Sequence, residues 1–189
     1  MKHRHFKIHK PYCYLSQFVN NQNKRKNKKL LGELGNFPEG IMAIGRLDEK
    51  SEGLLLLTTD GSVSEQIRGK SIEKEYYVQV NGIISNEAIT TLQAGVEISQ
   101  SSGKYTTLPC QVKQIEMPTY LGPPYRKRSE SHGPTSWISI TLTEGKFRQV
   151  RKMTAAVGYD TVRLVRVRIG AILLEDMKAG EVREIEALG

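Results

Sequence analysis

The sequence predicts an α+β fold in which a few helices accompany a mostly antiparallel mixed sheet. Short apolar or alternating segments recur along the 189 residues, and such segments are typical of β-strands. Only three stretches have helical spacing, and the connections between strands are long and hairpin-like. Strands interleaved with few helices in this way indicate an α+β domain.

The first part of the chain contains a polar loop between two apolar segments. Residues 8–14 predict a short first strand, and the Asn- and Lys-rich stretch 20–29 predicts a loop or a basic surface segment. Residues 41–44 are apolar and lead into GRLDEKSEGLLLLTTDG at 45–61. The run from Leu54 to Leu57 does not alternate, so we expect a strand buried on both faces. Rigid neighbours should therefore hold the polar loop.

The middle of the chain predicts a short helix, a strand and a second helix. Ser62 with Glu65 resembles a capping box that opens the short helix. Residues 73–81 alternate, which places Tyr76 on one face of a strand and Tyr77 on the other. Ser85 is a suitable N-cap for a helix to about residue 94, where Gly95 can end it. Residues 96–117 predict further strands.

The last third begins with a proline- and glycine-rich loop at 118–134, a length that is typical of functional or disordered loops. Residues 137–142 predict a strand and 147–157 a helix that ends at Gly158. On that helix Arg148, Arg151 and Lys152 share one face at spacings of three and four. Residues 162–169 predict a final strand.

Charge favours a polyanionic partner. The chain has 28 Lys and Arg against 20 Asp and Glu, a formal net charge of +8. Basic residues bind phosphates and release counterions, so clusters of them predict a nucleic-acid surface. Ordinary solubility is the simpler explanation of the net charge, but the clustering favours RNA. The expected RNA-binding residues are Lys24, Arg25, Lys26, Lys28, Lys29, Arg126, Lys127, Arg128, Arg148 and Lys152.

Several other classes find no support in the sequence. Two cysteines, Cys13 and Cys110, make no C-x-x-C pair, which favours a reducing compartment, and we expect the cytoplasm. No apolar run approaches the ~20 residues of a membrane span. The sequence has no Walker loop, dinucleotide fingerprint or metal-ligand cluster, so we expect no cofactor and no metal. His3, His5 and His9 fit a basic N-terminal tail at 1–9 better than a metal site.

Four segments together resemble one enzyme family. GRLDEKSEGLLLLTTDG at 45–61 resembles the active-site motif of the pseudouridine synthases, which isomerise uridine in RNA. KEYYV at 74–78 resembles the Lys-x-Tyr-x-Val strand of that family, and EGKFRQVRKM at 144–153 resembles its Gly-x-x-x-Gln-Val-Arg helix start. The last core motif is matched by Arg163, Leu164, Ile169 and Gly170. The resemblance follows the family's order and covers nearly all of the chain from Lys10 onward.

The resemblance is strongest to the branch that modifies bacterial ribosomal RNA. Most members of the branch carry an N-terminal RNA-binding module of the S4 type, and we expect none here, because the resemblance to the catalytic domain begins almost at the start of the sequence. A subtype acting on 23S rRNA is similar in lacking it and in a PTSW segment, here 134–137. The resemblance implies one catalytic domain at 10–189 with a central RNA-binding cleft. It also implies that the partner is ribosomal RNA, and within it 23S rRNA, either free or in an assembling ribosomal particle, and we expect a monomer.

The chemistry of isomerisation calls for a carboxylate near the ribose. Such a group can trap an electron-poor sugar or remove a proton from it. Asp48 lies between Gly45 and Gly53 and follows Arg46, whose guanidinium favours its ionised form. On spacing alone, an Asp48 that caps a turn and pairs with Arg46 is the better interpretation. The resemblance instead implies that Asp48 is the catalytic aspartate.

Four further residues receive substrate-binding roles from the resemblance. Tyr76 would stack on the uracil ring, and Leu164 would line the pocket below it. Arg151 would pair with Asp48, and Arg46 would help to extract the target nucleotide from its stack. Without the resemblance, Tyr76 and Leu164 are ordinary core residues, and Arg151 is one charge on a solvated helix face.

Two alternatives from other classes remain. A ribosome-associated RNA-binding protein without activity would need only the basic clusters. A glycoside hydrolase would need two acting carboxylates at a defined separation. Glu49 and Glu52 lie close to Asp48 in sequence, but the basic composition suits RNA better than a neutral sugar.

Overall fold

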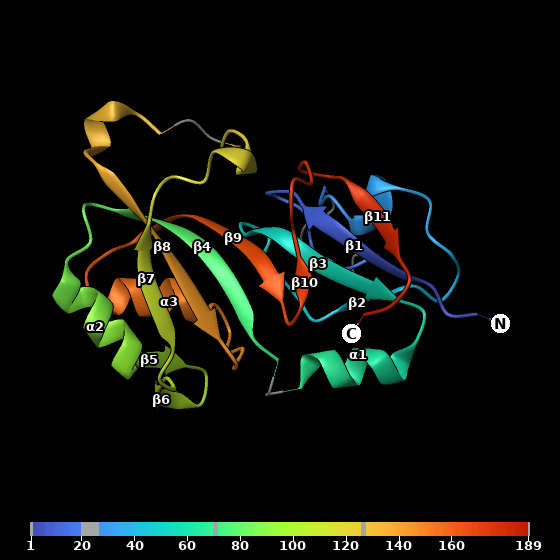
Figure 1. Ribbon diagram of the computed structural model, residues 1–189, viewed down its shortest axis with the longest axis horizontal. Coiled ribbons are helices and arrows are strands. Elements are labelled where there is room, and N and C mark those ends of the chain that lie inside the picture. Colours follow the sequence, from blue (N-terminus) through green and yellow to red (C-terminus); the bar gives the residue numbers. More distant parts are fainter. Residues whose placement is uncertain (1, 20–26, 70–71, 126–127, 189) are drawn as a thin grey trace. The chain divides into compact units, whose positions relative to one another are not determined.

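The computed structural model describes residues 2–19, 27–69, 72–125 and 128–188, and these form two compact units. Unit 1 consists of the described residues up to Ile72 together with those from Val165 onward, and unit 2 is Glu73–Leu164. Strands and helices occur in both, and almost all strand pairs are antiparallel (Figure 1). The α+β class with a mostly antiparallel mixed sheet is therefore confirmed.

Unit 1 is built around strand β3. Its strands follow the order β11-β1-β3-β9, with β2 paired to β3 and β10 to β9. Strand β1 is antiparallel to both of its neighbours, whereas β3 and β9 are parallel. The elements are β1 (His5–Lys10), η1 (Leu31–Leu34), β2 (Met42–Ile44), β3 (Glu52–Thr58), α1 (Gly61–Arg68), residues 165–169 of β9 (Thr161–Ile169), β10 (Ile172–Leu173) and β11 (Val182–Ile185).

The core of unit 1 confirms the prediction for the apolar run. All seven residues of β3 are buried, and Leu55 and Leu57 pack with Phe6 and Ile8 of β1. At the start of β3 the backbone meets β9 so closely that a Cβ on Gly53 would lie 2.2 Å from the carbonyl oxygen of Arg166. A glycine is therefore required where the polar loop joins the sheet.

The first strand differs from its prediction. Strand β1 spans His5–Lys10, whereas the sequence predicted 8–14. It ends earlier because Pro11 has no N–H for the ladder and Cys13 has a left-handed φ of 66°. It begins earlier because Phe6 and Ile8 are buried in the core of unit 1, although the basic residues around them, Lys7 and His9, gave this stretch a polar appearance; those two residues are buried as well. Residues 5–9, expected to belong to a tail, thus lie in the sheet.

The cap of helix α1 also differs from its prediction. The N-cap is Asp60, whose side chain accepts a hydrogen bond from the backbone N–H of Ser62 at 2.9 Å. Ser62 donates its own hydroxyl to the same carboxylate at 2.7 Å, so it supports the cap instead of providing it. A carboxylate also suits the positive end of a helix.

Unit 2 is an antiparallel sheet with helices on one face. Its strands follow the order β9-β4-β8-β7, with residues 161–164 of β9 belonging to this unit, and β5 and β6 form a separate hairpin. The elements are β4 (Lys74–Asn81), α2 (Asn86–Ala94), β5 (Glu97–Gln100), β6 (Gly103–Thr106), β7 (Gln111–Ile115), η2 (Thr119–Leu121), η3 (Glu130–His132), β8 (Thr135–Leu142) and α3 (Gln149–Ala156).

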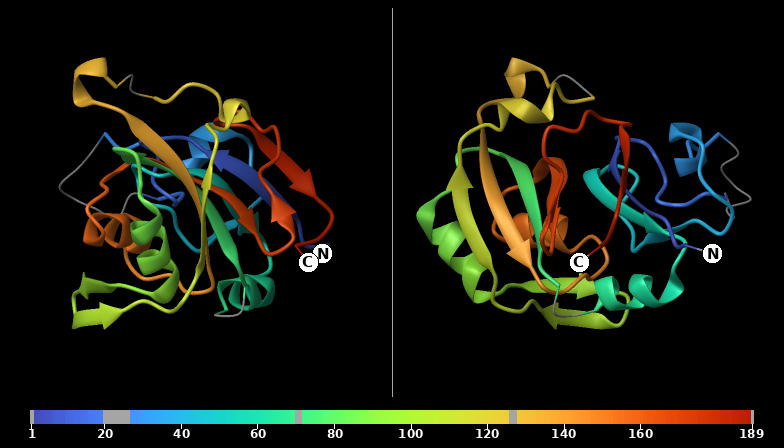
Figure 2. Two further views of the ribbon diagram at one scale, coloured as in Figure 1. Left: turned by 60° about the vertical axis from the view of Figure 1, so that its left-hand side comes forward. Right: turned by 45° about the vertical axis from the view of Figure 1, so that its right-hand side comes forward.

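Both helices of unit 2 pack on the same face of the sheet (Figure 2). Leu92 of α2 and Met153 of α3 are fully buried against Val78 of β4 and Ile140 of β8. Helix α2 has the predicted Ser85 cap, whose hydroxyl accepts from the backbone N–H of Ala88. None of the helices in the described part of the chain is long and apolar enough to cross a membrane.

The predicted helix over 147–157 is shorter in the structure. It begins at Gln149 because Arg148 has left-handed backbone angles, φ 53° and ψ 34°, which do not fit inside an α-helix. Arg148 is therefore the N-cap residue, and only Arg151 and Lys152 of the expected cationic stripe lie on the helix. Val150 and Met153, on another face of the helix, are buried in the core.

Candidate active site

The loop that carries Asp48 connects β2 to β3 in unit 1. Its turn is closed by a hydrogen bond from the backbone N–H of Ser51 to the carbonyl oxygen of Asp48, at 3.0 Å. The side chain of Asp48 is half-buried, that of Leu47 is buried, and that of Arg46 is exposed. The turn thus anchors the main chain at Asp48 and leaves its carboxylate partly open to solvent.

Residues 13–16 hold this loop on both sides of Asp48. Before it, the Ser16 hydroxyl accepts from the backbone N–H of Leu47 at 2.9 Å and donates to the carbonyl of Leu47 at 2.8 Å. After it, the backbone N–H of Cys13 donates to the carbonyl of Glu49 at 2.8 Å. The polar loop is therefore held by residues 13–16, which sequence reasoning did not single out, as well as by the strands that flank it.

A buried lysine supports the same loop. Lys10 is completely buried, and its ammonium nitrogen donates to the carbonyl oxygens of Pro11 and Tyr14 at 2.9 and 2.8 Å and reaches that of Glu49 at 3.5 Å. Burial lowers the pKa of Lys10 to about 7, and the negative charges of Glu52, Cys13, Asp48 and Glu49 oppose this lowering. Sequence reasoning missed this role of Lys10. The only sign of it in the sequence is that the lysine directly precedes Pro11, at which β1 ends.

Tyr76, Leu164 and Arg151 belong to unit 2. Leu164 is buried in the apolar cluster of that unit, and the half-buried ring of Tyr76 packs against the same cluster. Tyr77 faces the other side of β4 and meets Tyr120 edge to face, with ring centroids 6.5 Å apart. The alternation predicted for the two tyrosines is confirmed. Arg151, which is half-buried, follows the core residue Val150 on α3.

A buried carboxylate fixes the start of α3. Glu144 accepts hydrogen bonds from the hydroxyl of Tyr105 at 2.6 Å, the backbone N–H of Leu108 at 2.8 Å and the side-chain amide of Gln149 at 2.6 Å. The amide oxygen of Gln149 accepts from the backbone N–H of Lys146 at 2.9 Å. This Glu144–Gln149 bracket closes residues 144–149 into a fixed loop. The hydrogen bond to Glu144 raises the pKa of Tyr105.

The expected RNA-binding residues differ in their surroundings. Lys24, Arg25, Lys26, Arg126 and Lys127 lie outside the described residues. Lys28 pairs with the carboxylate of Glu49, and the Lys29 nitrogen lies 5.4 Å from the ring centroid of Tyr14. These two lysines therefore have contacts within unit 1.

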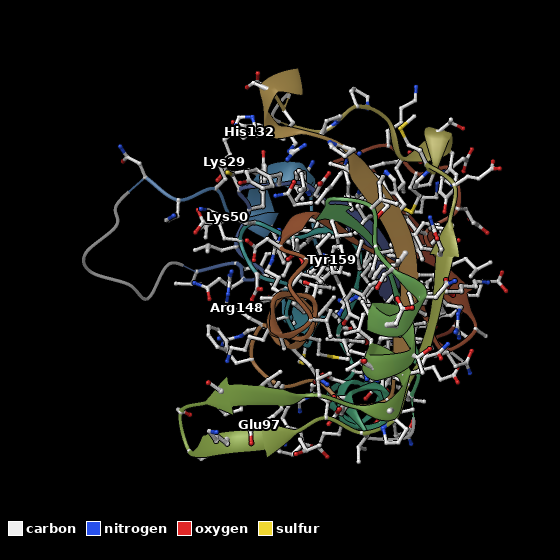
Figure 3. All side chains as sticks on the ribbon, turned by 90° about the vertical axis from the view of Figure 1, so that its left-hand side faces the viewer. Lys29, Lys50, Glu97, His132, Arg148 and Tyr159 are labelled. Atoms are coloured by element: carbon white, nitrogen blue, oxygen red, sulfur yellow. The ribbon has the colours of Figure 1, made fainter. Side chains whose placement is uncertain are left out.

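In unit 2, Arg128 donates to the carbonyl oxygens of Gly133 and His132, each at 2.6 Å, and to the side-chain oxygen of Asn81 at 2.5 Å. It thus stabilises the 118–134 loop. Lys152 donates to the carbonyl oxygen of Ser99 at 2.5 Å. Arg148 is exposed on the outer side of α3 (Figure 3).

The histidines of β1 have hydrogen-bond partners of their own. His5 Nδ1 lies 2.9 Å from the Thr58 hydroxyl, and His9 Nδ1 lies 2.7 Å from the carbonyl oxygen of Met177. Among the residues that the structure describes, no three His, Cys, Asp or Glu side chains come together in a way that could hold a metal ion.

Known proteins are similar to this chain in sequence and in fold. Residues 4–156 match the family model described as RNA pseudouridylate synthase. The ribosomal large subunit pseudouridine synthase E of Vibrio vulnificus (strain CMCP6) is 40% identical over 183 residues, which are 94% of this chain and 73% of that protein. The protein of the same name from Xanthomonas campestris pv. campestris is 39% identical over 185 residues, which are 95% of this chain and 94% of that protein.

Among solved structures, a crystal structure of a pseudouridylate synthase superposes with a TM-score of 0.77 at 23% identity, covering 98% of this chain and 71% of that one. At this identity the superposition shows a shared fold. The match to the family model covers most of the chain, and it includes the Asp48 loop, the Tyr76 strand and all of α3. The chain therefore belongs to the RNA pseudouridylate synthase family.

Proposed function

We propose that this enzyme converts one uridine of large-subunit ribosomal RNA to pseudouridine and that Asp48 is its catalytic group. The main support is the loop that carries Asp48, whose backbone is anchored on both sides while its carboxylate stays partly accessible. The relatives from Vibrio and Xanthomonas are named for the large ribosomal subunit, which supports the choice of RNA. The net charge of +8 suits a polyanionic substrate.

The reaction balances without an added reagent. The bond from the ribose carbon C1′ to N1 of uracil breaks, and a bond from C1′ to C5 forms. The proton on C5 leaves, and N1 gains one, so the product has the mass of the substrate. A carboxylate can assist by adding to C1′ or by removing a proton from the ribose, and either route fits Asp48. We therefore propose a reaction without a cofactor.

The remaining roles are part of the same proposal. Tyr76 is to stack on the uracil, with its hydroxyl near C5, and Leu164 is to line the base pocket. Arg151 is to pair with the Asp48 carboxylate. Arg46 is to assist extraction of the nucleotide, which costs a few kcal/mol of lost stacking. The exposed side chain of Arg46 and the half-buried ring of Tyr76 are compatible with these contacts.

The proposal extends to the cellular setting. We propose that the substrate is 23S rRNA, free or in an assembling particle, and that the enzyme acts as a monomer in the cytoplasm. The two cysteines are free thiols, which is compatible with a reducing compartment.

The decisive experiment compares two carboxylates of one turn. Asp48→Asn nearly preserves the size and hydrogen-bonding shape of the side chain but removes the charge, so we expect no pseudouridine in a large-subunit rRNA transcript and unchanged folding. Glu49→Gln is the matched control, and it should retain activity within about tenfold of wild type, equivalent to ~1.4 kcal/mol of barrier. Mass-neutral uridine conversion distinguishes isomerisation from base release.

An Asp48→Asn enzyme that is folded and still works within tenfold of wild type would contradict the assignment of Asp48. A wild-type protein that binds the transcript but forms no pseudouridine would instead favour a non-catalytic RNA-binding protein. Deleting the gene and mapping the pseudouridines of the host's ribosomal RNA would then identify the target, because a single position should be lost.

A further inference from the structure

Phe147 is the most exposed large apolar side chain among the described residues, with 69% of its surface accessible. Single exposed apolar residues are common on protein surfaces, so exposure alone indicates no function. What distinguishes Phe147 is that the structure holds its backbone rigidly in this exposed position.

Two features fix the backbone on either side of Phe147. Behind it, Arg148 has a left-handed φ of 53°, a conformation that a residue with a Cβ keeps only where the surroundings enforce it. Around it, the Glu144–Gln149 bracket closes the loop, since Gln149 accepts from the backbone N–H of Lys146 and donates to the buried Glu144 carboxylate. Phe147 therefore lies at the tip of a loop whose two ends are tied together.

Basic residues lie beside the exposed ring. The Lys152 ammonium lies 5.3 Å from the centroid of the Phe147 ring and is fixed by its hydrogen bond to the carbonyl of Ser99. Lys146 and Arg148, the residues on either side of Phe147 in sequence, are both exposed. The Lys146 nitrogen lies 4.3 Å from the ring centroid of Tyr105.

Two carboxylates of this region have partners other than Lys146 and Lys152. Glu144 is buried and already accepts three hydrogen bonds from Tyr105, Leu108 and Gln149. Glu97 on β5 pairs with Lys104 at 2.7 Å. The surface around Phe147 thus combines a fixed aromatic ring with the ammonium groups of Lys146 and Lys152.

We propose that Phe147 is a stacking platform for an unpaired base of the RNA, and that Lys146, Arg148 and Lys152 bind the phosphates beside that base. The inference rests on the proposed function through its RNA substrate. It adds a contact outside the base pocket and names the kind of RNA recognised there. A base inside a duplex is stacked on both faces by its neighbours and has no face free for the ring, so the platform selects a single-stranded nucleotide.

The chemistry favours RNA over an acidic protein segment. Aromatic rings that lie among cations are the usual means by which proteins bind single-stranded nucleic acid, because every base has a face that stacks and every nucleotide has a phosphate. An acidic peptide would use the three cations but would leave the exposed ring without a specific partner.

The Phe147→Trp variant allows a direct test. The chain has one tryptophan, Trp137, and it is buried, so the added tryptophan supplies a separate exposed emission. We expect a single-stranded oligouridylate to quench this added emission by stacking. An RNA duplex of equal nucleotide concentration, or polyglutamate, should quench it far less. Quenching by the duplex or by polyglutamate to the same extent would overturn the proposal.

Affinity gives an independent test. Phe147→Ala should weaken binding of the oligouridylate by about tenfold or more, and Phe147→Tyr should restore it, because loss of one base–aromatic stack has an effect of that order. The slope of affinity against salt should not change, since no charge is removed. Met117→Ala, which truncates a side chain of unit 2 that is 65% exposed, is the matched control and should bind like wild type.

The outcomes separate this inference from the proposed function. Unchanged affinity in Phe147→Ala, with normal pseudouridine formation by the wild type, would overturn the platform alone. A Phe147-dependent affinity without pseudouridine formation by the wild type would overturn the proposed function alone. A wild-type protein that binds neither the oligouridylate nor the rRNA transcript would overturn both.

Discussion

Replacing Lys10 by Met should change how the stability of the protein depends on pH. The substitution keeps a long unbranched side chain at a completely buried position and removes the ionisable nitrogen. In the wild type, burial lowers the pKa of this amine from 10.5 to about 7. Between these two pH values the unfolded chain holds a proton on Lys10 that the folded chain lacks.

The sign of the effect follows from this proton. Because the unfolded state binds more protons, the free energy of unfolding of the wild type rises with pH in this interval. The cost of burying the ammonium is fully present below pH 7 and disappears as the pH approaches 10.5. The maximal slope is about 1.4 kcal/mol per pH unit, which gives about 2 kcal/mol between pH 7 and pH 9.

Urea unfolding of the wild type and of Lys10→Met at pH 7, 8 and 9 measures this effect. The difference in unfolding free energy, wild type minus variant, should grow by about 2 kcal/mol across the range. Lys104→Met is the control, because Lys104 is exposed and pairing with Glu97 raises its pKa, so it stays charged throughout. A difference for Lys10→Met that stays flat would refute the reasoning. It would mean that the carbonyls of Pro11 and Tyr14 keep the ammonium charged.

Three further predictions concern the candidate site and the RNA surface. Tyr76→Phe should lower the rate of pseudouridine formation by about tenfold or more while RNA affinity stays unchanged. Full activity in this variant would mean that the Tyr76 hydroxyl takes no part in the reaction and that only the ring matters, through packing. Glu144→Gln should lower the unfolding free energy by about 2 kcal/mol in urea titrations, since it weakens three hydrogen bonds to a buried carboxylate; an unchanged midpoint would contradict the bracket. Neutralising Lys24, Arg25 and Lys26 together should weaken rRNA binding and reduce its salt dependence at a nearly unchanged bound-state rate, and a salt slope equal to wild type would count against that role.

Local patterns in the sequence predicted those elements whose cause is local. The run Leu54 to Leu57 predicted a strand buried on both faces, and all of β3 is buried. Ser85 predicted the cap of α2, and the alternation in 73–81 placed Tyr76 and Tyr77 on opposite faces. In each case the side chain that decides the structure lies within a few residues of the element.

Two features that sequence reasoning missed, the late start of α3 and the support of the Asp48 loop, have causes that are distant along the chain. The left-handed Arg148 that delays α3 sits in a loop tied by Glu144, whose other partners come from Tyr105 and Leu108. The support for the Asp48 loop comes from Lys10 and Ser16, which lie more than thirty residues before it. No window of local sequence contains these contacts, so periodicity could not reveal them.

Because of these distant contacts, the proposed functional side chains can be substituted without disturbing the fold around them. The contacts that hold the Asp48 loop reach the backbone of Leu47 and Glu49, and those that hold the Phe147 loop reach the backbone of Lys146. Neither set uses the side chain proposed to act on RNA. Because main-chain anchors survive a change of side chain, substitutions of Asp48 or Phe147 should alter chemistry or binding with little loss of stability. Substitutions of Lys10 or Glu144, the residues that provide the anchors, should instead change the stability of the protein.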